Sequence, residues 1–174
     1  MTATPQKLAG EKLAGLSDFQ RGGLRQQDFV AWTVETGELI RAGKFEQVDW
    51  IAVAEEIESL GRSDRRELKS RLEVLLQHLL KWQYQPSRQS KSWLRTIREQ
   101  RYRLEDLLID SPGLRAELEN PESENILSMV FDRSRKAASE ETNLPLHNFP
   151  ENCPYTLQQI LSPDFFPESN SSNS

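Results

Sequence analysis

Apolar side chains recur along the middle of the chain at the spacing of one face of an α-helix. Between Asp49 and Pro86 this face comprises Val53, Ile57, Leu60, Leu68, Leu72, Leu75, Leu79 and Trp82. Because steps of three, four or eight residues place side chains on the same side of a helix, we expect these residues to line the core. Asp49 suits the N-cap of this helix, and Gln85, which precedes Pro86, ends it. We expect a break or kink at Gly61, since glycine favours helix ends.

Shorter helical patterns lie on both sides of this central segment. The sequence predicts helices at about 29–42, 91–109, 112–119 and 121–142. Ser111-Pro112 and Asn120-Pro121 each place a capping residue before a proline at the first helical position. No segment shows the sustained two-residue alternation of a strand. The predicted fold class is therefore all-α, and we expect a helical bundle.

The C-terminal part combines prolines with large apolar side chains. Five of the nine prolines fall between residues 145 and 167, which excludes a long final helix. Phe149, Tyr155, Ile160 and Phe166 lie in the same stretch and are too apolar to be left in water. We expect a proline-rich C-terminal strap packed on the bundle, with one short helix near 156–161. We also expect a flexible segment at 1–27, a single helical domain at 28–168 and a disordered tail at 169–174.

Length, charge and cysteine content limit the class of protein. A chain of 174 residues is long enough for one sizeable core, and its formal charge of −5 gives no overall attraction to nucleic acid or anionic lipid. Cys153 is the only cysteine, which fits a reducing compartment. No apolar run reaches the length of a signal peptide or the roughly 20 residues of a membrane span. We therefore expect a cytoplasmic protein that does not bind a membrane.

A polar edge runs beside the apolar face of the central segment. It consists of Glu56, Ser63, Glu67, Arg71 and His78, at steps of four or seven residues. A carboxylate and an imidazole in a cleft suit acid–base catalysis or one metal ion, which makes Glu56 and His78 the candidate catalytic residues. We favour the alternative, a network of ion pairs such as Glu67–Arg71 that closes the edge of the bundle. Neither of the two histidines follows a glutamate at the spacing of di-iron bundles, so we predict no metal and no cofactor.

Basic residues cluster after the central segment. The cluster consists of Arg88, Lys91, Arg95, Arg98, Arg101 and Arg103, interleaved with the aromatic Trp93 and Tyr102. The candidate binding residues are Arg88, Lys91, Trp93, Arg95, Arg98 and Arg101. Lys91, Arg95, Arg98 and Arg101 are expected on one stripe of a helix. Cations so spaced suit successive phosphates, and an exposed aromatic suits base stacking. The alternative is that this stripe pairs with Glu55, Glu56 and Glu58 across a helix–helix interface. The acidic net charge and the neighbouring Glu99, Glu105 and Asp106 favour this internal pairing.

Several stretches resemble one known family. These are AEEIESLGRSDRRELKSRL, LLQHLLKWQYQP, TIREQR and ETNLPLHNFPENCPYTLQQILSPDFFPE, in this order along the chain. They resemble the bacterial family named domain of unknown function 29, from about residue 27 to residue 168. The resemblance implies an all-helical protein, and it brings no activity, ligand or partner with it.

The sequence alone favours a macromolecule-binding protein over an enzyme. Phosphate-binding glycine loops and serine-hydrolase elbows are missing from it, so the common nucleotide and acyl-transfer enzymes have no support. We predict a protein-interaction module whose partner binds a helical face or the strap. The alternative is a nucleic-acid-binding or processing protein that uses the basic helix 88–103, and a metal-dependent enzyme around Glu56 and His78 is third.

Overall fold

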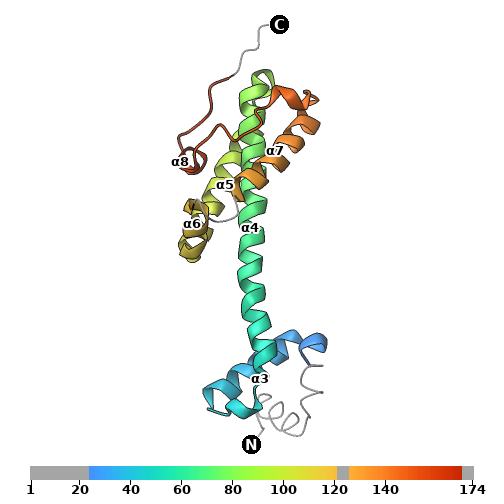
Figure 1. Cartoon of the computed structure of the whole chain (residues 1–174), viewed down its shortest axis with the longest axis vertical. Coiled ribbons are helices and arrows are strands. Elements are labelled where there is room, and N and C mark those ends of the chain that lie inside the picture. Colours follow the sequence, from blue (N-terminus) through green and yellow to red (C-terminus); the bar gives the residue numbers. More distant parts are fainter. Residues whose placement is uncertain (1–23, 121–125, 170–174) are drawn as a thin grey trace, which may run out of the picture. The chain divides into compact units, whose positions relative to one another are not determined.

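A computed structural model describes residues 24–120 and 126–169 of the chain, and within these ranges all regular structure is helical (Figure 1). The predicted all-α class is therefore confirmed. The chain divides into two compact units, with unit 1 ending at Leu60 and unit 2 beginning at Gly61. The flexible segment predicted at 1–27 lies mostly outside the described residues, as does the tail after residue 169, while residues 24–27 are helical. The single domain over 28–168 stays a prediction.

In the described part of unit 1, a turn links helix α3 to the start of helix α4. Helix α3 spans Phe29–Arg41, a short 3-10 turn η1 covers Phe45–Gln47, and helix α4 begins at Trp50. Asp28 caps α3, because its Oδ1 accepts from the backbone N–H of Ala31 at 2.9 Å. Asp49 caps α4 as predicted, since its Oδ1 accepts from the N–H of Ala52 at 3.0 Å.

Helix α4 spans Trp50–Tyr84 without interruption, so the predicted break at Gly61 is wrong. A single glycine costs a helix only about 1 kcal/mol relative to alanine, and the helix-forming residues around Gly61 offset that cost. The predicted end is confirmed, because α4 stops at Tyr84, directly before Gln85 and Pro86.

Unit 2 packs the second part of α4 against three further helices and the short turn η2 at Pro86–Arg88. These helices are α5 (Lys91–Asp110), α6 (Pro112–Glu119) and α7 (Ile126–Thr142). Leu68, Leu72, Leu75 and Leu79 of α4 are all fully buried, which confirms the predicted core face over this part of the helix. Ser134 of α7 joins α7 to α4 by donating to the carbonyl oxygen of Glu73 at 3.0 Å. The predicted start of α7 near Pro121 lies outside the described residues.

The C-terminal strap is part of unit 2, as predicted. It contains a 3-10 turn η3 at Leu146–Asn148 and the short helix α8 at Leu157–Leu161, which Thr156 caps. Phe149, Tyr155 and Ile160 are buried in the core. The hydroxyl of Tyr155 also donates to Oε1 of Gln83 on α4 at 2.6 Å. The strap thus contributes both apolar and polar contacts to the packing of unit 2.

Two residues assigned to the core from the sequence are exposed. Ile57 and Leu60 of α4 have 65% and 62% of their surface open to solvent. Periodicity identifies the side chains that share a face of a helix, but it does not show whether a neighbouring element covers that face. The apolar pattern of α4 is therefore a core pattern over residues 68–80 and a surface pattern around residues 57–60.

Candidate functional site

Three of the predicted basic residues lie on one exposed side of α5. Lys91, Arg95 and Arg98 are spaced by four and three residues, and each is exposed. Arg88, at the end of η2, is exposed as well. Tyr102 follows Arg98 by one helical turn and has 61% of its surface exposed. We call these five side chains the basic face of α5.

Arg101 does not belong to this face, so its assignment to the basic stripe is wrong. It is only 5% exposed, and its guanidinium donates to the carbonyl oxygens of Ile160, Pro163 and Phe165 in the strap. Burial lowers the pKa of Arg101 to about 10, and the charge of Asp164 acts in the opposite direction. Three residues after Arg98, the helix has turned enough to direct this side chain into the packed side of α5. Arg101 therefore holds the strap.

The acidic residues that were expected to neutralise the stripe have another partner. Arg25 in unit 1 binds Glu55 at 2.7 Å, Nη1 to Oε2, and Glu56 at 3.0 Å, Nη2 to Oε2. Glu55 and Glu56 therefore already have a cation within unit 1, and the favoured prediction, pairing of the stripe in unit 2 with this acidic cluster, stays a prediction. Among the described residues of unit 2, Arg88, Lys91, Arg95 and Arg98 have no ion-pair partner.

Trp93 is half-buried and is covered by a lysine. The ammonium of Lys81 lies 4.6 Å from the centre of the Trp93 ring and binds Oε2 of Glu141 at 2.5 Å. The hydrogen bond from Lys81 lowers the pKa of Glu141, and burial acts against it. Trp93 is thus engaged within unit 2 rather than presented to a ligand. The sequence analysis did not predict the contact between Lys81 and Trp93. The available signal was a lysine between the apolar residues Leu80 and Trp82.

The two candidate catalytic residues have separate surroundings. Glu56 belongs to unit 1 and accepts from Arg25, whereas His78 lies in unit 2. The His78 ring nitrogen Nδ1 lies 2.8 Å from the carbonyl oxygen of Val74, to which it donates. Burial lowers the pKa of His78 first of all, and the nearby charge of Lys81 lowers it further. His78 therefore has the contacts of a packed neutral histidine rather than those of a general base with an acidic partner.

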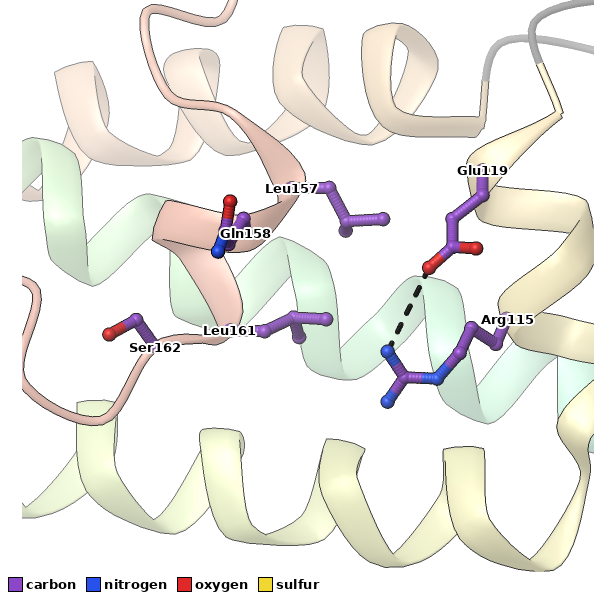
Figure 2. A pocket seen from close by; sticks show the side chains of 6 residues that line it. All are labelled: Arg115, Glu119, Leu157, Gln158, Leu161 and Ser162. Atoms are coloured by element: carbon purple, nitrogen blue, oxygen red, sulfur yellow. Dashed lines mark ion pairs between the residues drawn. The ribbon is translucent and has the colours of Figure 1, made fainter.

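Figure 2 shows a cavity of about 530 Å³ lined by residues of α6, α8 and the residue after α8. Leu157 and Leu161 face the side chains of Arg115 and Glu119 across this space. Nη1 of Arg115 and Oε1 of Glu119 are 3.8 Å apart. The lining residues include no histidine and no cysteine. One side of the cavity is therefore apolar, and the other is an exposed ion pair. The lining residues do not include a nucleophile paired with a base.

A second cavity, of about 370 Å³, lies between α4 and α5 and is strongly polar. Its lining residues are Asp64, Glu67, Arg71, Arg103, Asp106, Leu107, Asp110 and Ser111. Arg71 binds Glu67 at 2.7 Å, Nη2 to Oε1, which confirms the ion pair predicted for the polar edge. Across the residues that the structure describes, no group of three or more histidine, cysteine, aspartate or glutamate side chains is placed to hold a metal ion.

The sequence reasoning also missed an apolar surface on unit 1. Twelve large apolar side chains are exposed in the described residues, and eight of them lie in unit 1. We call these eight the apolar surface of unit 1: Phe29, Val30, Val34, Phe45, Trp50, Ile51, Ile57 and Leu60. The signal in the sequence was Val30, Val34 and Ile51, which are apolar but fall outside the predicted core face.

The described helices define an all-α protein. The family model described as Domain of unknown function DUF29 matches residues 24–166, and the chain belongs to this family. A search of curated proteins and a search of solved structures both found no match. None of the described helices is both long and apolar enough to cross a membrane.

Proposed function

We propose that this chain is a protein-interaction module whose partner binds the apolar surface of unit 1. The observation that carries the proposal is the concentration of eight exposed large apolar side chains within residues 29–60. Contiguous exposed apolar side chains, such as those that follow one side of a helix, are typical of interaction sites, whereas single exposed apolar residues are ordinary. A cytoplasmic location is part of the proposal, because the single cysteine fits a reducing compartment.

The spacing of the apolar side chains suits a helical partner. Trp50, Ile57 and Leu60 are separated by seven and three residues on α4, so they follow one side of the helix. Ten residues of α-helix extend over roughly 15 Å, which is nearly three turns of a partner helix. Recognition of an amphipathic helix through anchors at such spacings is a common binding mode.

The charge of unit 1 identifies the chemistry of the partner. Residues 24–60 contain eight carboxylate side chains and three basic ones, a formal charge of −5. A second copy of the chain would bring the same acidic charge to the interface, and like charges oppose association. A partner helix with apolar anchors and flanking lysine or arginine residues complements both features. We therefore infer that the partner presents a basic amphipathic helix.

Two synthetic helical peptides test this proposal on the full chain. One is an amphipathic helix of leucine and lysine, and the other has the same leucines with glutamate in place of lysine. Fluorescence anisotropy should show binding of the basic peptide and none of the acidic one. Equal binding of both, or binding of neither, would overturn the proposal.

Sedimentation of the chain alone tests the competing occupant, a second copy. We expect a monomer at all concentrations, because the acidic surfaces repel each other. Two results together would contradict the proposed partner: the natural chain forms a dimer that Ile57→Ser dissociates, and the natural chain does not bind the basic peptide. They would assign the apolar surface to self-association.

A further inference from the structure

We propose that the basic face of α5 binds single-stranded nucleic acid, at a site separate from the apolar surface of unit 1. Arg88, Lys91, Arg95 and Arg98 are exposed and carry their charge without an ion-pair partner among the described residues of unit 2. Three of them fall on one side of α5 within two turns, so their cationic groups follow a line along roughly 10 Å of helix axis. A line of cations is the arrangement that tracks a phosphate backbone.

The local charge is strongly positive although the whole chain is acidic. Residues 74–98 contain five basic side chains and no aspartate or glutamate, in a chain with 27 acidic residues, and the exposed Glu99 follows between Arg98 and Tyr102. Glu141 neutralises one of the five, Lys81, at 2.5 Å. The four that remain are the cationic members of the basic face, Arg88, Lys91, Arg95 and Arg98. Repulsion of a polyanion by the net charge of −5 is screened beyond about 8–10 Å at physiological salt, whereas direct contacts to these four cations are made at shorter range.

Tyr102 is the feature that favours a single strand. Its ring is 61% exposed and lies one turn beyond Arg98 on the same side of α5. Unpaired bases stack on exposed aromatic rings, whereas the bases of a duplex are already stacked on one another. Trp93 is not available for this role, because Lys81 covers its ring. The phosphates would therefore follow Arg88, Lys91, Arg95 and Arg98, and a base would stack on Tyr102.

Fluorescence anisotropy of a labelled oligo(dT), an oligo(U) and a mixed-sequence DNA duplex tests the site on the full chain. We expect both single strands to bind more tightly than the duplex. With four phosphate contacts, the slope of log K against log salt for the single strands should be about −2.8, since each contact contributes roughly 0.7. Arg95→Gln with Arg98→Gln should bring this slope to about −1.4.

Matched variants separate the site from the general charge of the protein. Arg66→Gln with Arg133→Gln removes the same charge from two other exposed arginines of unit 2 and should leave affinity within about twofold. Tyr102→Ala should lower the single-strand affinity about fivefold or more, and Tyr102→Phe should keep it, because phenylalanine retains the stacking ring. Circular dichroism of each variant checks that the helices are intact.

Four results would overturn the inference. The first is no binding of either single strand at about 50 mM salt, and the second is equal loss of affinity in the control double variant. The third is preference for the duplex with no effect of Tyr102→Ala. Binding of phosphatidylserine vesicles through Arg95 and Arg98, with no binding of the oligonucleotides, would assign the basic face to a membrane surface and equally contradict the proposal. None of these results depends on the peptide-binding surface of unit 1.

Discussion

Arg101 Nη2 donates a hydrogen bond of 2.7 Å to the carbonyl oxygen of Phe165. The same guanidinium donates through Nε to the carbonyl oxygen of Ile160 at 2.9 Å, and its carbon lies 5.4 Å from the centre of the Phe166 ring. One buried side chain of α5 therefore donates hydrogen bonds to carbonyl groups at the end of α8 and beyond it. These carbonyl groups have no following helical turn to supply a backbone N–H donor. This contact explains how a proline-rich segment with few backbone hydrogen bonds of its own packs as part of unit 2.

Replacing Arg101 tests its role in holding the strap. Arg101→Leu keeps an apolar body but leaves buried carbonyl oxygens without a donor, which should cost about 3 kcal/mol of the free energy of unfolding. Arg98→Leu, on the exposed side of the same helix, should change it by less than about 0.5 kcal/mol. Urea unfolding measures both values, and limited proteolysis should cut the strap of the Arg101 variant first. Equal losses in the two variants would show that Arg101 does not hold the strap.

His78 predicts a loss of stability on mild acidification. Burial lowers its pKa below the ordinary value of 6.5, so the unfolded chain takes up a proton before the folded protein does. The stability linked to neutral His78 is complete above pH 6.5 and is lost as the pH falls toward the folded pKa. Urea unfolding at about pH 7.5 and pH 5.5 should show this loss in the natural chain and a smaller one in His78→Gln.

His147 is the control, because it is the second histidine of the chain and is exposed. His147→Gln should retain the pH dependence of the natural chain. If His78→Gln loses as much stability between the two pH values as the natural chain does, the linkage does not come from His78.

Two glycines should respond to alanine in opposite directions. Gly61 lies within α4, and a Cβ there would meet only the guanidinium of Arg65 at 3.7 Å. Gly61→Ala should therefore raise the free energy of unfolding by about 0.4–1 kcal/mol. Gly43 has a φ of +69°, which strains any residue with a side chain. Gly43→Ala should therefore lower the free energy of unfolding by about 1 kcal/mol or more. Thermal unfolding of both variants checks the signs, and destabilisation by Gly61→Ala would show that α4 is interrupted at this position.

The fold could be predicted from the sequence wherever a local pattern decides the outcome. The leucines of α4 from Leu68 to Leu79 repeat at helical spacing and are buried, and Asp49 has the chemistry of an N-cap and caps α4. Ile57 continues the same pattern and is exposed, because burial depends on which other element covers a face. The break predicted at Gly61 does not occur, because a single glycine costs little stability within a long helix.

The candidate site was harder to predict because ion pairs depend on tertiary contacts. Arg101 was grouped with its neighbours on α5, yet the strap carbonyls that it binds lie about 60 residues further along the chain. The sequence did not identify Arg25 as a partner of Glu55 and Glu56, because Arg25 precedes the region in which helical periodicity is evident. The exposure of Lys91, Arg95 and Arg98 follows from the lack of a facing element, which no local pattern encodes.

The measurement that most directly tests the proposed docking surface compares two isoleucines with the same exposure. Ile57 on unit 1 and Ile109 on unit 2 are each 65% exposed, so serine at either position removes a similar apolar area and leaves the core intact. In a titration of the leucine–lysine helix onto the full chain, Ile57→Ser should weaken binding by about tenfold, because one apolar anchor contributes roughly 1.5 kcal/mol. Ile109→Ser should bind like the natural chain. Equal affinity of the two variants would contradict a partner site on the apolar surface of unit 1.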